Sequence, residues 1–170
     1  DVLKWHRENP DNWEKTWGLI NEKYNLNPDY RKFSCSGKGD PFNIDAKLNG
    51  AYVVMGMLYG DGDIEKTIAI SARCGQDSDC NPANSGGILF TTIGFKALPE
   101  EYISALDYNT KFSYTDYSVS KLIDVCAKLV RDAVLRSGGK IETGKDGKEY
   151  FLIPVKEPVT GALEQCWDAV

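Results

Sequence analysis

The segment RCGQDSDCNP, residues 73–82, joins two predicted helices and organises the chain on either side of it. It places Asp77 and Asp79 two residues apart, after a glycine and before a helix start. Hard divalent cations prefer oxygen ligands, and a short loop can aim two such carboxylates at one ion or let them bridge two. The segment is therefore our best candidate for a metal-assisted site. The alternative is a solvated loop that caps the next helix.

The sequence on both sides of this loop predicts helices. Downstream, we expect Asn81 as the N-cap, Pro82 as the first helical residue and Gly94 as the C-cap. Upstream, residues 46–59 are the most apolar part of the chain, and their length and small residues predict a buried helix. A tight turn follows, and Asp63 then caps a helix over residues 64–73.

Two amphipathic helices are expected further from the loop. Residues 11–24 carry an aromatic stripe that we assign to the core, and a loop over residues 25–42 should pack down through Phe33 and Cys35. Residues 118–137 carry the clearest apolar stripe, which includes Cys126 as a predicted core residue.

After this helix, a Gly-Lys-Asp-Gly turn between two short β-prone runs, residues 140–143 and 149–154, predicts a hairpin. The tail from Val155 looks irregular.

The composition excludes several classes of function. A net charge of -5 argues against nucleic-acid binding through bulk electrostatics. No run approaches the roughly 18 apolar residues that a membrane-spanning helix needs. With one histidine, His6, which we expect at the surface, neither a Cys/His metal cluster nor a Ser/His/Asp triad is favoured. The odd number of cysteines, five, favours free thiols. This slightly favours the cytoplasm, although the compartment stays open.

Residues 75–80, Gly-Gln-Asp-Ser-Asp-Cys, resemble the second metal motif of the ADP-ribosylglycohydrolases, which is usually Gly-x-Asp-Thr-Asp-Thr. The predicted helix pair before the motif and the small-residue helix after it are similar to that family as well. The resemblance covers residues 44–103 well and the flanks weakly. It implies a mainly α, orthogonal helical bundle, present here in part, to which the late β-hairpin is added.

The resemblance also implies a site. The family holds two Mg²⁺ ions at the bottom of a cleft that binds ADP-ribose. By this resemblance Asp77 and Asp79 would be metal ligands. Gln76 and Ser78 flank them and could hydrogen-bond the substrate or the outer shell, the alternative being that these loop side chains only satisfy backbone groups. Cys80 stands where the family usually has a hydroxyl ligand, and a thiol suits Mg²⁺ poorly. Either Cys80 leaves the shell or the preferred metal changes.

A second departure concerns what is missing. The family's other metal ligands form a Thr/Ser-Asp-Asp cluster, which does not occur in these 170 residues. The sequence also begins at Asp1 without Met. We therefore expect residues 1–138 to be the C-terminal half of the family's domain, and residues 139–170 to be a hairpin and tail. The catalytic acidic residue would lie in the missing N-terminal half, and this chain alone would be inactive.

Two functions follow as hypotheses. The first is metal-dependent hydrolysis of ADP-ribosyl bonds in the intact protein, on an ADP-ribosylated protein or small molecule. The alternative is a non-catalytic helical module that binds a nucleotide-sugar or a protein partner.

Overall fold

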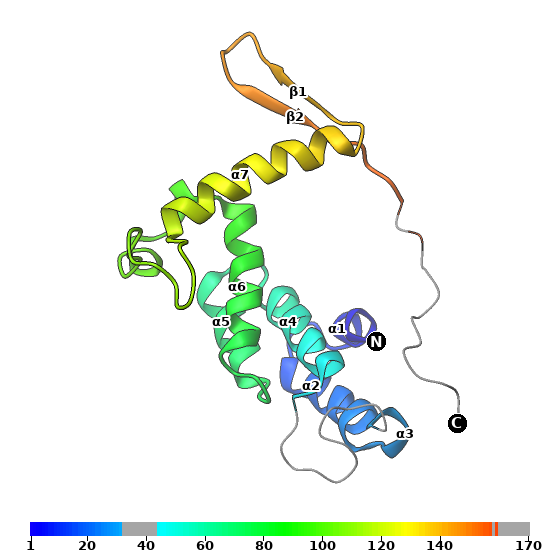
Figure 1. Ribbon diagram of the computed structural model, residues 1–170. Helices are drawn as coiled ribbons and strands as arrows, with labels where there is room; N and C mark the ends of the chain where they lie inside the picture. Colours follow the sequence, from blue (N-terminus) through cyan, green and yellow to red (C-terminus); the bar gives the residue numbers. More distant parts are fainter. Residues whose placement is uncertain (32–43, 158, 160–170) are drawn as a thin grey trace, which may run out of the picture. The chain divides into compact units, whose positions relative to one another are not determined.

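The computed structural model describes residues 1–31, 44–157 and 159, and the predicted contacts of Phe33 and Cys35 lie outside these residues. The described chain is mainly helical, with one antiparallel hairpin late in the sequence, as predicted (Figure 1). It divides into two compact units, Asp1–Ser104 and Ala105–Val170. This division reports packing within the chain, and the domain boundary expected after residue 138 stays a prediction. Among the described residues, no helix combines the length and apolar character that crossing a bilayer requires.

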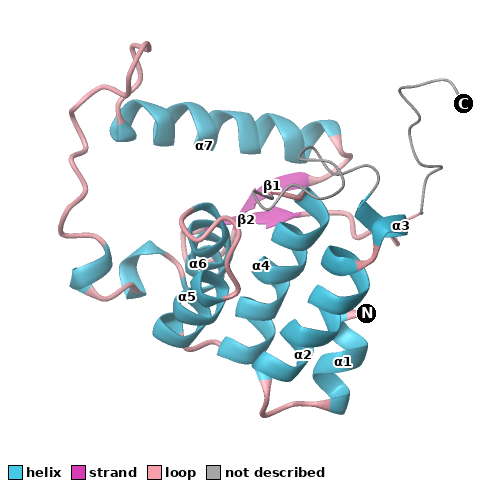
Figure 2. Cartoon of the chain, turned by 90° about the horizontal axis from the view of Figure 1, so that it is seen from below, coloured by secondary structure: helices cyan, strands magenta, loops and turns pink. Residues whose placement is uncertain are grey.

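The first unit begins with short helical segments: α1 (Val2–Glu8), α2 (Trp13–Ile20), a π-helix η1 (Asn21–Leu26) and α3 (Pro28–Arg31). Asn12 caps α2 by accepting a 2.8 Å hydrogen bond from the Lys15 N–H. The helix predicted over residues 11–24 therefore exists, but its last turn widens into a π-helix. Figure 2 shows α1 and α2 beside α4.

The expectation of a surface position for His6 needs correction. Its side chain is half-buried, and its ring packs edge-to-face on Tyr59 with 4.7 Å between the ring centres. An aromatic partner more than fifty positions away along the chain leaves no local signal in the sequence around a histidine.

Three helices form the centre of this unit: α4 (Ala46–Gly60), α5 (Ile64–Arg73) and α6 (Cys80–Ile93). Asp63 caps α5 as predicted, with its side chain accepting a hydrogen bond from the Lys66 N–H at 2.8 Å. A Cβ built on Gly60 would lie 2.0 Å from the Thr67 hydroxyl oxygen, so α4 and α5 pack at a distance that only glycine allows. The buried apolar core consists of Ile20, Leu48, Tyr52, Met55 and Cys74.

Burial has a chemical consequence for two core side chains. It raises the pKa of the Tyr52 hydroxyl to about 12 and that of the Cys74 thiol to about 12. The carbonyl of Cys74 also accepts a 2.8 Å hydrogen bond from the Trp17 indole N–H, which ties α2 to the end of α5. The expected aromatic stripe therefore does pack on the core.

Two single-turn 3₁₀ helices, η2 (Phe95–Ala97) and η3 (Glu100–Tyr102), follow Gly94, the predicted C-cap of α6. The second unit then contains α7 (Val119–Arg136) and the strands β1 (Lys140–Thr143) and β2 (Glu149–Leu152). The strands pair antiparallel, with Lys140 opposite Leu152. Arg131 on α7 donates two hydrogen bonds, of 2.7 and 2.9 Å, to the Glu149 carboxylate on β2.

The prediction that Cys126 lies in the core is wrong, since its side chain is exposed. The apolar stripe of α7 around it is also largely exposed, with Leu129 at 59% and Ile123 at 54%. The stripe correctly predicted a helix, but an amphipathic pattern does not show which surface, if any, covers its apolar face.

Candidate metal centre

The loop between α5 and α6 reverses the chain in very few residues. Gly75 and Gln76 both adopt left-handed backbone conformations, with φ of 85° and 62°. The Asp77 N–H donates to the Gly75 carbonyl at 2.9 Å, which closes the bend. Glycine takes such a conformation at no steric cost, whereas Gln76 does so only because the surrounding structure holds it there. The bend delivers the two aspartates directly to the start of α6.

Asp77 and Asp79 have different surroundings at that helix start. Asp77 is half-buried, and its Oδ1 accepts a long, 3.4 Å hydrogen bond from the Cys80 N–H. Its carbonyl accepts from the Asn81 N–H at 3.0 Å. Asp79 is exposed and occupies the N-cap position, without the usual side-chain capping hydrogen bond to the helix. Its exposure leaves the Asp79 carboxylate accessible to a ligand.

The structure brings the predicted ligand atoms together. One oxygen from each of Asp77 and Asp79 and the Cys80 sulfur all lie within 4.8 Å of one another. Carboxylates this close to a helix N-terminus also gain from its partial positive charge. Their mutual repulsion would be relieved by a cation placed between them.

Hydrogen bonding within the loop sets two protonation equilibria. The pKa of Asp79 lies below its usual value, first because of a hydrogen bond with the Asp77 side chain and then because of the backbone N–H groups of Asp79 and Cys80. The pKa of the Cys80 thiol is raised, first by its hydrogen bond to Asp77 and then by the charges of Asp77 and Asp79. Without a cation, therefore, the loop favours an ionised Asp79 and a protonated Cys80.

These donors fit part of a Mg²⁺ shell. Mg²⁺ is usually held by one or two carboxylates and keeps several waters, which two exposed or half-buried aspartates allow. Cys80 does not fit the same ion, because its sulfur is soft and its thiol is stabilised in the protonated form. The chain thus offers two oxygen ligands from Asp77 and Asp79.

The other two predicted residues lie in the same loop. Ser78 is exposed. Gln76 is half-buried, and its side-chain oxygen is shielded from solvent without a hydrogen-bond partner among the described residues. Their role in substrate binding stays a prediction.

Asn81 departs from the role predicted for it. The helix starts at Cys80, so Asn81 is not the N-cap but a residue of the first turn. It is only 2% exposed, and its side-chain Nδ2 donates to Oδ1 of Asn49 on α4 at 3.1 Å. The N-cap preference of asparagine pointed to the right turn and the wrong residue, and no sequence signal links Asn81 to a partner on α4.

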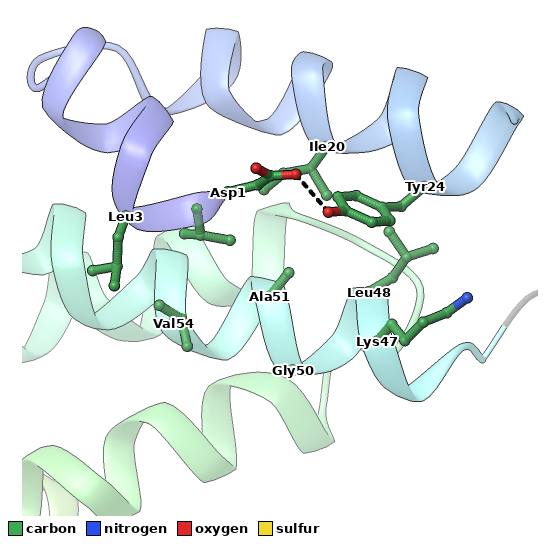
Figure 3. Close-up of a pocket in the computed structure, with 10 residues that line it drawn as sticks. Asp1, Leu3, Ile20, Tyr24, Lys47, Leu48, Gly50, Ala51 and Val54 are labelled. Atoms are coloured by element: carbon green, nitrogen blue, oxygen red, sulfur yellow. Dashed lines mark hydrogen bonds between the residues drawn. The ribbon is translucent and has the colours of Figure 1, made fainter. Parts of the chain in front are cut away.

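A separate cavity of about 430 Å³ lies among α1, α2, η1 and α4 (Figure 3). Its lining is mostly apolar, and the Tyr24 hydroxyl at its edge donates to the Asp1 carboxylate at 2.5 Å. None of its lining residues belongs to the 75–80 loop. It is therefore no part of the candidate metal centre.

Comparison with known proteins supplies the family. The model of the ADP-ribosylglycohydrolase family matches residues 3–137, from α1 to the residue after α7. Comparison with the curated proteins and with the solved structures gave no match. The family match includes the Asp77–Asp79 loop and all the helices that position it. The chain belongs to the ADP-ribosylglycohydrolase family.

Proposed function

We propose that the intact protein hydrolyses ADP-ribosyl glycosidic bonds with the help of divalent cations such as Mg²⁺. Asp77 and Asp79 would supply some of the ligands that bind these cations. Membership of the family supports hydrolysis of ADP-ribosyl linkages at the level of the class. The observation that supports metal dependence is the convergence of the two carboxylates at the start of α6.

The chemistry assigns limited roles to this chain. A divalent cation at such a site orients substrate oxygens and makes water more acidic. Asp77, half-buried and tied to the helix start, would fix the position of the site, and exposed Asp79 would complete it. The substrate would be an ADP-ribosylated protein or small molecule, whose ribose hydroxyls are oxygen ligands of the required kind.

The family's other metal motif has no counterpart in this sequence. Because the 170 residues contain no Thr/Ser-Asp-Asp cluster, we propose that the other ligands and the catalytic acid belong to a segment outside this sequence. Two carboxylates alone hold a divalent ion weakly, so the chain by itself would show little activity.

The test is a pair of substitutions in the intact protein. Asp77→Asn with Asp79→Asn keeps the size of both side chains and removes both charges. We expect the release of ADP-ribose from an ADP-ribosylated peptide to fall at least about 100-fold, since even outer-shell partners of a metal change activity by 10- to 100-fold. Asp61→Asn is the matched control, because Asp61 is an exposed turn aspartate with a left-handed backbone that asparagine also accepts.

An unchanged rate and unchanged Mg²⁺ affinity in the double variant would rule the proposal out. Cys80 places a thiol where the family usually has a hydroxyl ligand, which favours a second candidate, a module that binds a nucleotide-sugar without hydrolysing it. In that case the intact protein would bind ADP-ribose in calorimetry while every ADP-ribosylated substrate stayed intact.

A further inference from the structure

The hydrogen bond between Asn49 and Asn81 joins the start of α6 to α4. The two residues are 32 positions apart, and Asn81 lies one residue after Cys80 and two after Asp79. Asn49 lies one turn into α4, where its own N–H donates to the carbonyl of the N-cap Asp45 at 2.9 Å. This hydrogen bond therefore links the first turn of α6, which follows the loop of Asp77 and Asp79, to the first turn of α4.

Asn81 also closes the loop from within. Its backbone N–H donates to the Asp77 carbonyl at 3.0 Å while its side chain reaches α4. The segment with both aspartates is thus held at one end by the left-handed residues Gly75 and Gln76, and at the other end by Asn81. A shift of Asn81 would carry Asp77 with it through this backbone bond.

A hydrogen-bonded pair of side-chain amides adds little net stability to a contact between two helices. A buried amide loses its hydration, and one hydrogen bond returns only part of that loss, whereas apolar groups of the same shape would be neutral or stabilising. Directional polar contacts can instead fix one arrangement of helices among several similar ones. The 2% exposure of Asn81 therefore suggests a contact that orients α6 rather than one that merely stabilises it.

We propose that Asn49 and Asn81 are positioning residues for the cation site of Asp77 and Asp79. This inference rests on the proposed function, because it assigns the pair to the cation site of that function. The hydrogen bond sets the rotation of the start of α6 against α4, and with it the direction of the two carboxylates.

The experiment separates positioning from stability with isosteric leucines. Asn49→Leu and Asn81→Leu each leave the other amide without its partner, so both single variants should melt at a lower temperature. The double variant replaces both amides by apolar groups of the same number of heavy atoms and should regain stability. Affinity for Mn²⁺ alone, without substrate, is measured from the free-ion electron paramagnetic resonance signal of the intact protein.

We expect the stable double variant to bind Mn²⁺ at least about tenfold more weakly than wild type, the lower end of the loss seen when outer-shell partners are removed. Asn84→Leu is the control, because Asn84 lies on the same turn, is exposed, and its side chain donates to the Cys80 carbonyl of its own helix at 2.8 Å. It should bind Mn²⁺ as wild type does.

Wild-type affinity in the double variant would overturn the inference and leave the proposed function intact. Absence of Mn²⁺ binding in wild type would overturn the proposed function, and the inference with it. Should the double variant not fold, Asn49→Asp gives the same decision, because it keeps an oxygen acceptor for Asn81. Asn49→Leu should bind Mn²⁺ more weakly than wild type, whereas Asn49→Asp should bind it no more weakly than wild type. Equal losses of affinity in the two variants would contradict the inference.

Discussion

The helices α4 and α7 both carry apolar side chains that predicted packing against a core, yet these side chains have opposite surroundings. In α4, Leu48, Tyr52 and Met55 are at most 1% exposed, and neighbouring helices cover them. In α7, Leu129 and Val130 are 59% and 54% exposed. The difference teaches that an apolar pattern predicts a helix and its apolar face, while burial depends on partners that lie far away in the sequence.

The difference in burial between the two helices is tested most strongly by the same substitution, leucine to alanine, in each of them. Leu48→Ala removes a fully buried side chain and should lower the free energy of unfolding by about 2–5 kcal/mol. Leu129→Ala removes an exposed one and should change it by less than about 0.5 kcal/mol. Urea unfolding followed by circular dichroism measures both. Equal losses would show that α7 is as well covered as α4.

Glycine substitutions test the close packing of α4 on α5. Gly60→Ala places a methyl group where the Thr67 side chain and backbone already lie, and should destabilise the protein by about 1–3 kcal/mol. Gly50→Ala, in the same helix with nothing within 4 Å, should stabilise it by up to about 1 kcal/mol. Thermal melting gives the sign of each change, and opposite signs are required.

Cysteine reactivity tests burial without destabilising the protein. Cys74 is buried, with its pKa raised to about 12, whereas Cys126 on α7 is exposed. At pH 8, iodoacetamide should modify Cys126 at least about tenfold faster than Cys74, because the thiolate is the reacting form and a buried thiol is inert. Peptide mass spectrometry resolves the two sites. In urea the two rates should converge, and comparable rates in the native protein would contradict the burial of Cys74.

The smallest expected effect is the difference in stability between substitutions at two helix N-caps, Asp63 and Ser118. Asp63 accepts its N–H bond at 2.8 Å, whereas Ser118 at the start of α7 accepts one from Lys121 at 3.4 Å. Asp63→Ala should therefore cost about 1 kcal/mol and Ser118→Ala clearly less. Urea unfolding of both variants checks the order, and a larger loss for Ser118→Ala would reverse our ranking of the two caps.

Local signals explain most of what the sequence predicted correctly. The cap at Asp63, the turn before it and Gly94 at the end of α6 each depend on residues within a few positions of one another. The closeness of the Asp77 and Asp79 carboxylates has the same local origin, since both residues lie in one short loop, and their role as metal ligands stays a prediction.

The predictions that failed depend instead on contacts between residues that lie far apart in the sequence. The exposure of Cys126, the contact of His6 with Tyr59 and the bond of Asn81 to Asn49 all depend on which distant segment covers a side chain. The N-cap preference placed the start of α6 two residues too late, because the helix already begins at Cys80, with Asp79 in the N-cap position. A cap preference acts locally, and the tertiary contact of Asn81 overrides it.

The most direct test of the central claim is anomalous scattering from Mn²⁺ bound to the intact protein. We predict an anomalous peak between the carboxylates of Asp77 and Asp79, and loss of both the peak and ADP-ribosyl hydrolysis when EDTA removes the metal. No peak beside these two residues, with hydrolysis that continues in EDTA, would contradict the account.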